Sequence, residues 1–200
     1  VKSVLQFTSD IVIIDSHSTD KTVSICESLG ARVYAHSFVN QAVQFNWALD
    51  NIPLNTEWII RLDSDEIIPS DLSLEIQEVI SSGTDANAFS ICRKMYWMGR
   101  WLRYGRMYPH FITRLFRNGY ARYEERTEEH LIVEGSIQSL KCTFFENNKK
   151  NNLDYFMTKH LQTAKGELYE HLSVHSYDSS IKPRLFGPRV NRTRWLKFYI

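Results

Sequence analysis

Three acidic residues stand within four positions of the segment RLDSDE, residues 61–66, directly after the apolar run EWII. Asp63, Asp65 and Glu66 repel one another at neutral pH, so a fold that gathers them needs a cation, basic neighbours or full solvation. Alternation along a strand points Asp63 and Asp65 the same way. Two converging carboxylates form a hard-oxygen site for Mg²⁺ or Mn²⁺, whose other ligands come from water and substrate phosphates. The segment therefore predicts a divalent cation that neutralises a leaving diphosphate, with a solvated acidic turn as the alternative.

Alternating strands and helices have to position these carboxylates. Apolar runs predict strands at 10–15, 31–35 and 57–63, and amphipathic segments predict helices at 18–30 and 40–52 between them. This spacing predicts βαβ units, and hence an α/β fold with a mostly parallel sheet. Ligands of such sheets bind beyond the carboxyl ends of the strands, where Asp15 and Asp63 both stand.

The later part of the chain has a different pattern. A helix is expected at 71–81, short strands are expected at 87–94, 111–117 and 131–135, and a long amphipathic helix is expected at 153–172. Two hundred residues with a net charge of +1 are compatible with one soluble globular domain. The three isolated cysteines are typical of reduced thiols in a cytosolic protein.

Basic residues are concentrated in two segments despite the neutral total. Residues 93–126 hold nine Lys/Arg and nine aromatic residues against two acidic ones, and residues 181–200 hold six basic residues and no acidic one. Such segments suit phosphates, nucleic acid or an anionic membrane surface. The neutral overall charge and the absence of a recognition motif argue against nucleic acid as the partner.

The segment VIIDSHSTDKTVSICESLGARVY, followed by NQAVQFNWAL and EWIIRLDSDE, resembles the nucleotide-binding half of the family-2 inverting glycosyltransferases. The likeness is closest to the branch that builds lipopolysaccharide core and other surface polysaccharides. It implies a GT-A type fold, a Rossmann-like nucleotide-sugar binding sheet flanked by helices, with a smaller mixed-strand acceptor region and C-terminal helices. It also implies Mn²⁺ or Mg²⁺ as cofactor and a nucleotide-sugar donor, UDP-linked, as substrate.

The resemblance assigns the donor site to individual residues of this chain. It implies that Asp15 accepts a hydrogen bond from the nucleotide base and that Asp63 contacts the ribose or base region. Asp65 binds the divalent ion, with Asp63 as a second metal candidate, and Glu66 orients the turn. At the start of the second helix, Gln41 and Asn46 stand where this branch lines the nucleotide-sugar pocket, although both also fit the polar face of an ordinary helix.

Inverting transfer needs a base for the acceptor hydroxyl, and the resemblance locates it in RTEEHLIVEG, residues 126–135. Glu129 matches the family's Glu and is the expected base. Glu128 replaces the family's His and is the second candidate, and a charged turn before a strand is the alternative. On the long helix, Lys159 is expected to reach the diphosphate and His160 the metal, unless His160 is an ordinary structural residue.

These expectations combine into one hypothesis. The chain is interpreted as a single glycosyltransferase domain, with residues 1–82 as the nucleotide-sugar half, 83–150 as the acceptor half and 151–200 as a helical basic segment. We expect it to be a fragment that lacks the family's first strand. The acceptor is expected to be a saccharide or lipid-linked saccharide, and the location is expected to be cytoplasmic, peripheral at the inner membrane face. A sugar nucleotidyltransferase, an inactive remnant and a nucleic-acid-binding module are the alternatives.

Overall fold

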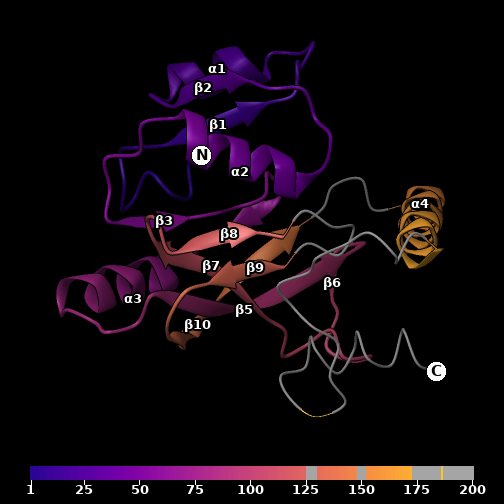
Figure 1. The fold of residues 1–200 in the computed structure, drawn as a ribbon. Helices are drawn as coiled ribbons and strands as arrows, with labels where there is room; N and C mark the ends of the chain where they lie inside the picture. Colours follow the sequence, from indigo (N-terminus) through magenta and orange to yellow (C-terminus); the bar gives the residue numbers. More distant parts are fainter. Residues whose placement is uncertain (125–129, 148–151, 173–185, 187–200) are drawn as a thin grey trace.

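The computed structural model describes residues 1–124, 130–147, 152–172 and 186. Its strands form three groups, of which the β1–β2 pair lies above the other two in Figure 1. The first group is a parallel pair, β1 (Val12–Asp15) and β2 (Arg32–Ala35), joined by helix α1 (Thr22–Ser28). Ile13 pairs with Val33, and Asp15 is the last residue of β1. The β-branched apolar run at 11–14 forms this strand because such side chains pack well on a pleated surface.

The second group is a six-stranded sheet that supports the acidic segment. Its strands follow the order β3-β7-β5-β10-β4, and β6 pairs with the end of β5. Their bounds are β3 (Trp58–Ile60), β4 (Glu66–Ile67), β5 (Ala88–Trp97), β6 (Arg100–Trp101), β7 (Phe111–Arg117) and β10 (Ile137–Asn147). The third group is a short antiparallel pair, β8 (Ala121–Tyr123) and β9 (Leu131–Val133). Strands from both sides of residue 82 therefore share the central sheet.

The α/β class predicted from the sequence is confirmed, but the prediction of a mostly parallel sheet is wrong. Among the described strands, only β1 with β2 and β5 with β10 pair in parallel, whereas the pairs β3–β7, β5–β7 and β4–β10 are antiparallel. The reason is that β7 follows β5 after the β6 turn and runs back beside it. In doing so β7, rather than β1, becomes the hydrogen-bonded neighbour of β3.

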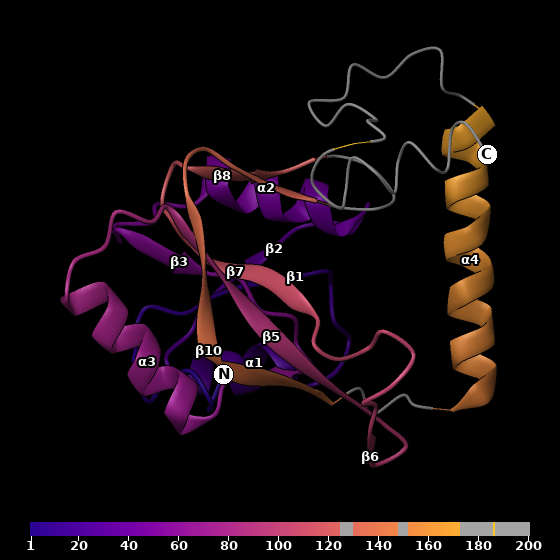
Figure 2. The same ribbon diagram turned by 90° about the horizontal axis from the view of Figure 1, so that it is seen from below.

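Three further helices complete the described fold: α2 (Gln41–Asn51), α3 (Ser70–Ser81) and α4 (Leu153–Leu172). Helix α2 begins at the predicted place because the Asn40 side chain accepts a hydrogen bond from the Val43 N–H at 2.7 Å. Helix α3 buries Leu72 and Ile76 against the sheet. Helix α4 lies at one side of the fold in both Figure 1 and Figure 2, and its Phe156 ring lies 5.9 Å, centroid to centroid, from the Trp97 ring of β5.

One hydrophobic core joins the upper pair of strands to the central sheet. Ile11 and Ala31 belong to the same buried cluster as Phe89, Leu115 and Phe144. Because apolar burial contributes about 25 cal/mol per Å² removed from water, this shared core holds the two sheets together without hydrogen bonds between β1 and β3. Among the described residues, no helix is long and apolar enough to cross a membrane.

Candidate functional site

The acidic segment forms a tight turn after β3. The Glu66 N–H donates to the Asp63 carbonyl at 3.0 Å, and the Asp63 N–H donates to the Glu66 carboxylate at 2.9 Å. Strand alternation therefore does not apply to Asp63 and Asp65, because the backbone has left the strand before Ser64. The turn is attached to the end of β10, where the Asn147 N–H donates to the Asp65 carbonyl at 3.0 Å.

Two arginines balance the charge of this turn. Arg114, from the middle of β7, is only 4% exposed and forms ion pairs with the Asp63 carboxylate at 2.9 Å and with Glu66. Arg61 pairs with the other Asp63 oxygen at 2.7 Å. Burial raises the pKa of the Glu66 carboxyl, and the nearby Arg114 guanidinium opposes that rise. The repulsion evident in the sequence is thus relieved by basic neighbours at Asp63 and Glu66.

Asp65 differs from the other two acids. Within the described part of the chain, its carboxylate has no recorded hydrogen bond or ion pair, and its side chain is half-buried. The described residues contain no cluster of three or more His, Cys, Asp or Glu side chains arranged around one point. A single free carboxylate still suits Mg²⁺ or Mn²⁺, since these ions take most of their ligands from water and phosphate. Asp63 fits that role less well, because arginines already contact both of its oxygens.

A cavity of about 720 Å³ opens beside the turn. It is polar and carries charges of both signs. Its lining comes from α2, the acidic turn, β4, β5, β10 and α4, and consists of Gln41, Asp63, Ser64, Asp65, Ile67, Arg93, Glu146, Asn147, Tyr155 and Lys159. The structure therefore brings together four of the residues expected in the site, namely Gln41, Asp63, Asp65 and Lys159.

Gln41 is positioned by the first turn of α2, where its side-chain oxygen accepts a hydrogen bond from Arg61. Asp15 is buried at the end of β1 and is not among the residues that line this cavity. Its carboxylate accepts a hydrogen bond from the Ser18 N–H at 2.8 Å. Hydrogen bonds from Ser18 lower the pKa of Asp15, which keeps this carboxylate ionised. Gln44 links α2 to β1, since its side-chain amide donates a hydrogen bond to the Ile14 carbonyl at 3.3 Å.

Two further expected residues take other positions. Asn46 is 5% exposed, and its amide exchanges hydrogen bonds with the Tyr123 backbone at 2.9 and 3.0 Å, which ties α2 to β8. His160 lies against the Phe156 ring, and its Nδ1 donates to the Phe156 carbonyl at 2.9 Å. It is not among the residues lining the cavity. Glu128 and Glu129, the expected bases, lie outside the described residues.

Several residues of the cavity were not expected from the sequence. Arg93 and Glu146 form an ion pair at 2.7 Å across neighbouring strands, and Tyr155 enters from α4. Arg114 was missed as well, although a signal was present. In FITRLFR, the arginine occupies the same strand face as Ile112 and Phe116, and a buried arginine requires a carboxylate partner.

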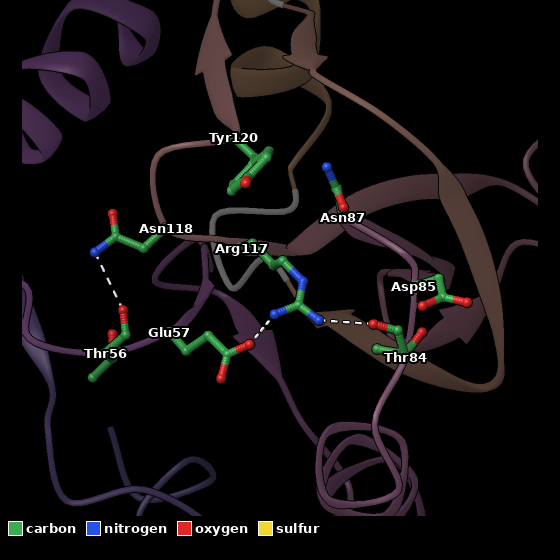
Figure 3. A pocket seen from close by; sticks show the side chains of 8 residues that line it. All are labelled: Thr56, Glu57, Thr84, Asp85, Asn87, Arg117, Asn118 and Tyr120. Atoms are coloured by element: carbon green, nitrogen blue, oxygen red, sulfur yellow. Dashed lines mark hydrogen bonds and ion pairs between the residues drawn. The ribbon is translucent and has the colours of Figure 1, made fainter.

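A second cavity, of about 510 Å³, lies where β3 begins (Figure 3). The Arg117 guanidinium there pairs with Glu57 and donates to the Thr84 carbonyl at 2.7 Å and the Ala86 carbonyl at 3.2 Å. The Asn118 amide donates to the carbonyls of Leu54 and Thr56. These polar groups fasten loops to one another, and the Asp85 carboxylate in the lining is exposed at the surface instead of standing beside neutralised acids as Asp65 does.

Comparisons with known proteins show the family of this chain. The model of the family described as "Glycosyl transferase family 2" matches residues 1–152. An uncharacterized glycosyltransferase of Rickettsia conorii is 30% identical over 125 residues, which is 62% of this chain and 44% of that relative. A lipopolysaccharide core biosynthesis glycosyltransferase of Rhizobium meliloti is 24% identical over 140 residues, 66% of this chain and 51% of the relative. The matched part of this chain thus spans about half the length of these relatives or less.

Proposed function

Because the chain belongs to glycosyl transferase family 2, we propose that it transfers a sugar, with inversion, from a nucleoside diphosphate donor, UDP-linked, to a saccharide acceptor. The acceptor is a saccharide or lipid-linked saccharide of cell-surface polysaccharide or lipopolysaccharide synthesis, in keeping with the name of the Rhizobium meliloti relative. The observation that carries the proposal is the unpaired Asp65 carboxylate on a polar cavity, next to two acids that arginines have neutralised.

The residues of the cavity divide the work of donor binding. When Mg²⁺ or Mn²⁺ is bound at Asp65, it neutralises charge on the diphosphate leaving group. Lys159 supplies a cation for the same phosphates, and Gln41 supplies an amide from the α2 side. Asp63, held between Arg61 and Arg114, offers its carboxylate edge to the ribose. Asp15 lies outside the lining of this cavity, ionised at the end of β1, and is the proposed acceptor for the nucleotide base.

The acceptor side involves residues beyond those the structure describes. Glu129 takes the proton of the acceptor hydroxyl as it attacks the anomeric carbon, and Glu128 is the second candidate. The basic and aromatic residues of 93–126 hold an anionic, lipid-linked acceptor, with the chain peripheral at the inner face of the membrane.

Calorimetric titration of UDP into this chain, with and without Mn²⁺, tests the proposal. We expect binding that depends on Mn²⁺ and whose metal-dependent part disappears in Asp65→Asn. Asp85→Asn is a matched control, because Asp85 is an exposed acid that lines the second cavity. Absence of UDP binding by the folded wild-type chain would sink the UDP assignment, and metal-dependent binding that survives in Asp65→Asn would remove Asp65 from the metal site.

A further inference from the structure

A basic and aromatic projection leaves the central sheet at the end of β5. We call residues 95–107 the β5–β6 finger. It contains a two-residue turn at Met98 and Gly99, across which Trp97 pairs with Arg100, and then β6. A second turn follows, in which the Met107 N–H donates to the Tyr104 carbonyl at 3.3 Å. In both Figure 1 and Figure 2, β6 lies on the side of the molecule away from α3.

All charged residues of the finger are arginines. Arg100, Arg103 and Arg106 are exposed, and the sequence has no Asp or Glu between residues 93 and 123. In the part of the chain that the structure describes, no ion pair joins these three arginines to a carboxylate. Arg103 instead lies over the Trp101 ring, 4.3 Å from its centroid. The finger therefore presents positive charge that no carboxylate of the described residues balances, with Arg103 stacked on an aromatic ring.

Apolar side chains stand among these charges. Met98 is 63% exposed and Tyr104 is 86% exposed. Met98 also has a φ of 49°, and Arg106 a φ of 64°, each beside a glycine of positive φ. Asn or Gly occupies such turn positions at lower free energy than Met or Arg. The finger thus keeps a long apolar and a long cationic side chain where the local backbone disfavours both, as structures do at functional positions.

We propose that the β5–β6 finger docks on the surface of an anionic lipid bilayer. Met98 and Tyr104 lie at the boundary of headgroups and acyl chains, where a thioether side chain and a phenol ring both partition. Arg100, Arg103 and Arg106 lie among the lipid phosphates, with which arginine forms bidentate hydrogen bonds. A nucleic acid would match the charge of the finger but offers no apolar phase to Met98. This inference names the part of the chain that makes the membrane contact of the proposed function. It rests on the proposed function for the lipid-linked acceptor.

Sedimentation with vesicles tests the finger directly. The wild-type chain is expected to bind vesicles that contain phosphatidylglycerol, to bind pure phosphatidylcholine far more weakly, and to lose binding as salt rises. Arg100→Gln/Arg106→Gln should weaken binding to the anionic vesicles roughly 30-fold, from about fivefold per cation. Met98→Asn should weaken it about tenfold through lost apolar contact, with the fold retained, because Asn suits the left-handed turn.

Matched variants from distant parts of the fold serve as controls. Leu74→Gln removes an apolar side chain on α3 that is 66% exposed, and Lys21→Gln removes an exposed cation beside α1. Both should bind anionic vesicles as the wild type does. Absence of binding by the wild type, equal losses in the controls, or finger variants that lose a single-stranded RNA probe while keeping the vesicles would each overturn the proposal. UDP titration of the same samples separates this result from the donor assignment, since the two proposals fail independently.

Discussion

The acidic turn and the β5–β6 finger use the same residue type in opposite ways. Arg114 is buried and paired with two carboxylates, so its charge is neutralised inside the fold. The three arginines of the finger are exposed and have no carboxylate within 93–123. The comparison shows that the basic excess of residues 93–126 is not one surface. Part of it neutralises the acidic turn, and another part remains available for an anionic partner.

The largest expected effect on stability comes from removing the buried Arg114 guanidinium. Arg114→Met leaves the buried Glu66 carboxylate without its cation and still beside Asp63. We therefore expect the free energy of unfolding to fall by about 3–5 kcal/mol. Urea denaturation measures it. The double variant Arg114→Met/Glu66→Met removes both buried charges and should lose less than the single variant. A single variant as stable as the wild type would contradict the role of Arg114.

Within the acidic turn, substitutions of the two aspartates should differ in their effect on stability. Asp63→Asn removes an anion that contacts two arginines and should lower stability by about 1–2 kcal/mol. Asp65→Asn removes an unpaired carboxylate and should leave stability within about 0.5 kcal/mol of the wild type. Thermal unfolding in the absence of metal compares them. Equal losses in the two variants would mean that Asp65 also has a structural partner.

The exposed side of the comparison predicts a near-zero effect on stability. Arg100→Gln/Arg106→Gln should change the free energy of unfolding by less than about 0.5 kcal/mol, since neither side chain is paired within the described residues. The measurement is the same urea denaturation that is used for Arg114→Met. A loss above 1 kcal/mol would show that the finger arginines support the fold instead of a partner.

A pH-dependent effect concerns a carboxylate that has backbone partners instead of arginines. Glu75 of α3 accepts from the Lys141 and Cys142 N–H groups, both at 2.8 Å, where the pairing of β10 with β5 is irregular. Burial opposes ionisation of Glu75, but these hydrogen bonds lower its pKa below the ordinary value of 4.5. The stability it contributes is therefore present above that value and is lost as pH falls through the lowered pKa.

The test measures the free energy of unfolding between pH 6 and pH 3 for the wild type and for Glu75→Gln. The stability difference between the two proteins should shrink as the pH falls, by a few tenths of a kcal/mol to about 1 kcal/mol. A difference that is constant with pH would show that protonation of Glu75 is not involved.

Local patterns predicted the elements better than their pairing. The helix at 153–172 and the strand at 111–117 have the expected bounds, because each has a clear apolar period. Strand β10 was missed, since its first residues are exposed and an irregularity interrupts its alternation. The pairing of β3 with β7 depends on contacts between residues more than 50 positions apart, which no local pattern encodes.

The site shows the same limit. Asp63 and Asp65 were recognisable because their charges crowd into a short segment, and the cavity contains both. Arg114 was not found, because its partners are remote in the sequence. Asn46 was predicted as a residue of the donor pocket, but in the structure it bonds to the Tyr123 backbone. The sequence could not separate these roles, because a polar residue on a helix has the same appearance whether it faces a ligand or a backbone.

The link between Asn46 and β8 has a consequence for how this region can evolve. Asn46 bonds to the backbone N–H and C=O of residue 123, so its partner is present whatever side chain stands there. The link therefore constrains position 46 without constraining position 123, and it leaves no covarying pair in a family of related sequences. An invariant buried asparagine, opposite a residue that varies only within what its packing on Phe45 and Arg61 allows, is the expected signature of this joint between α2 and the β8–β9 pair.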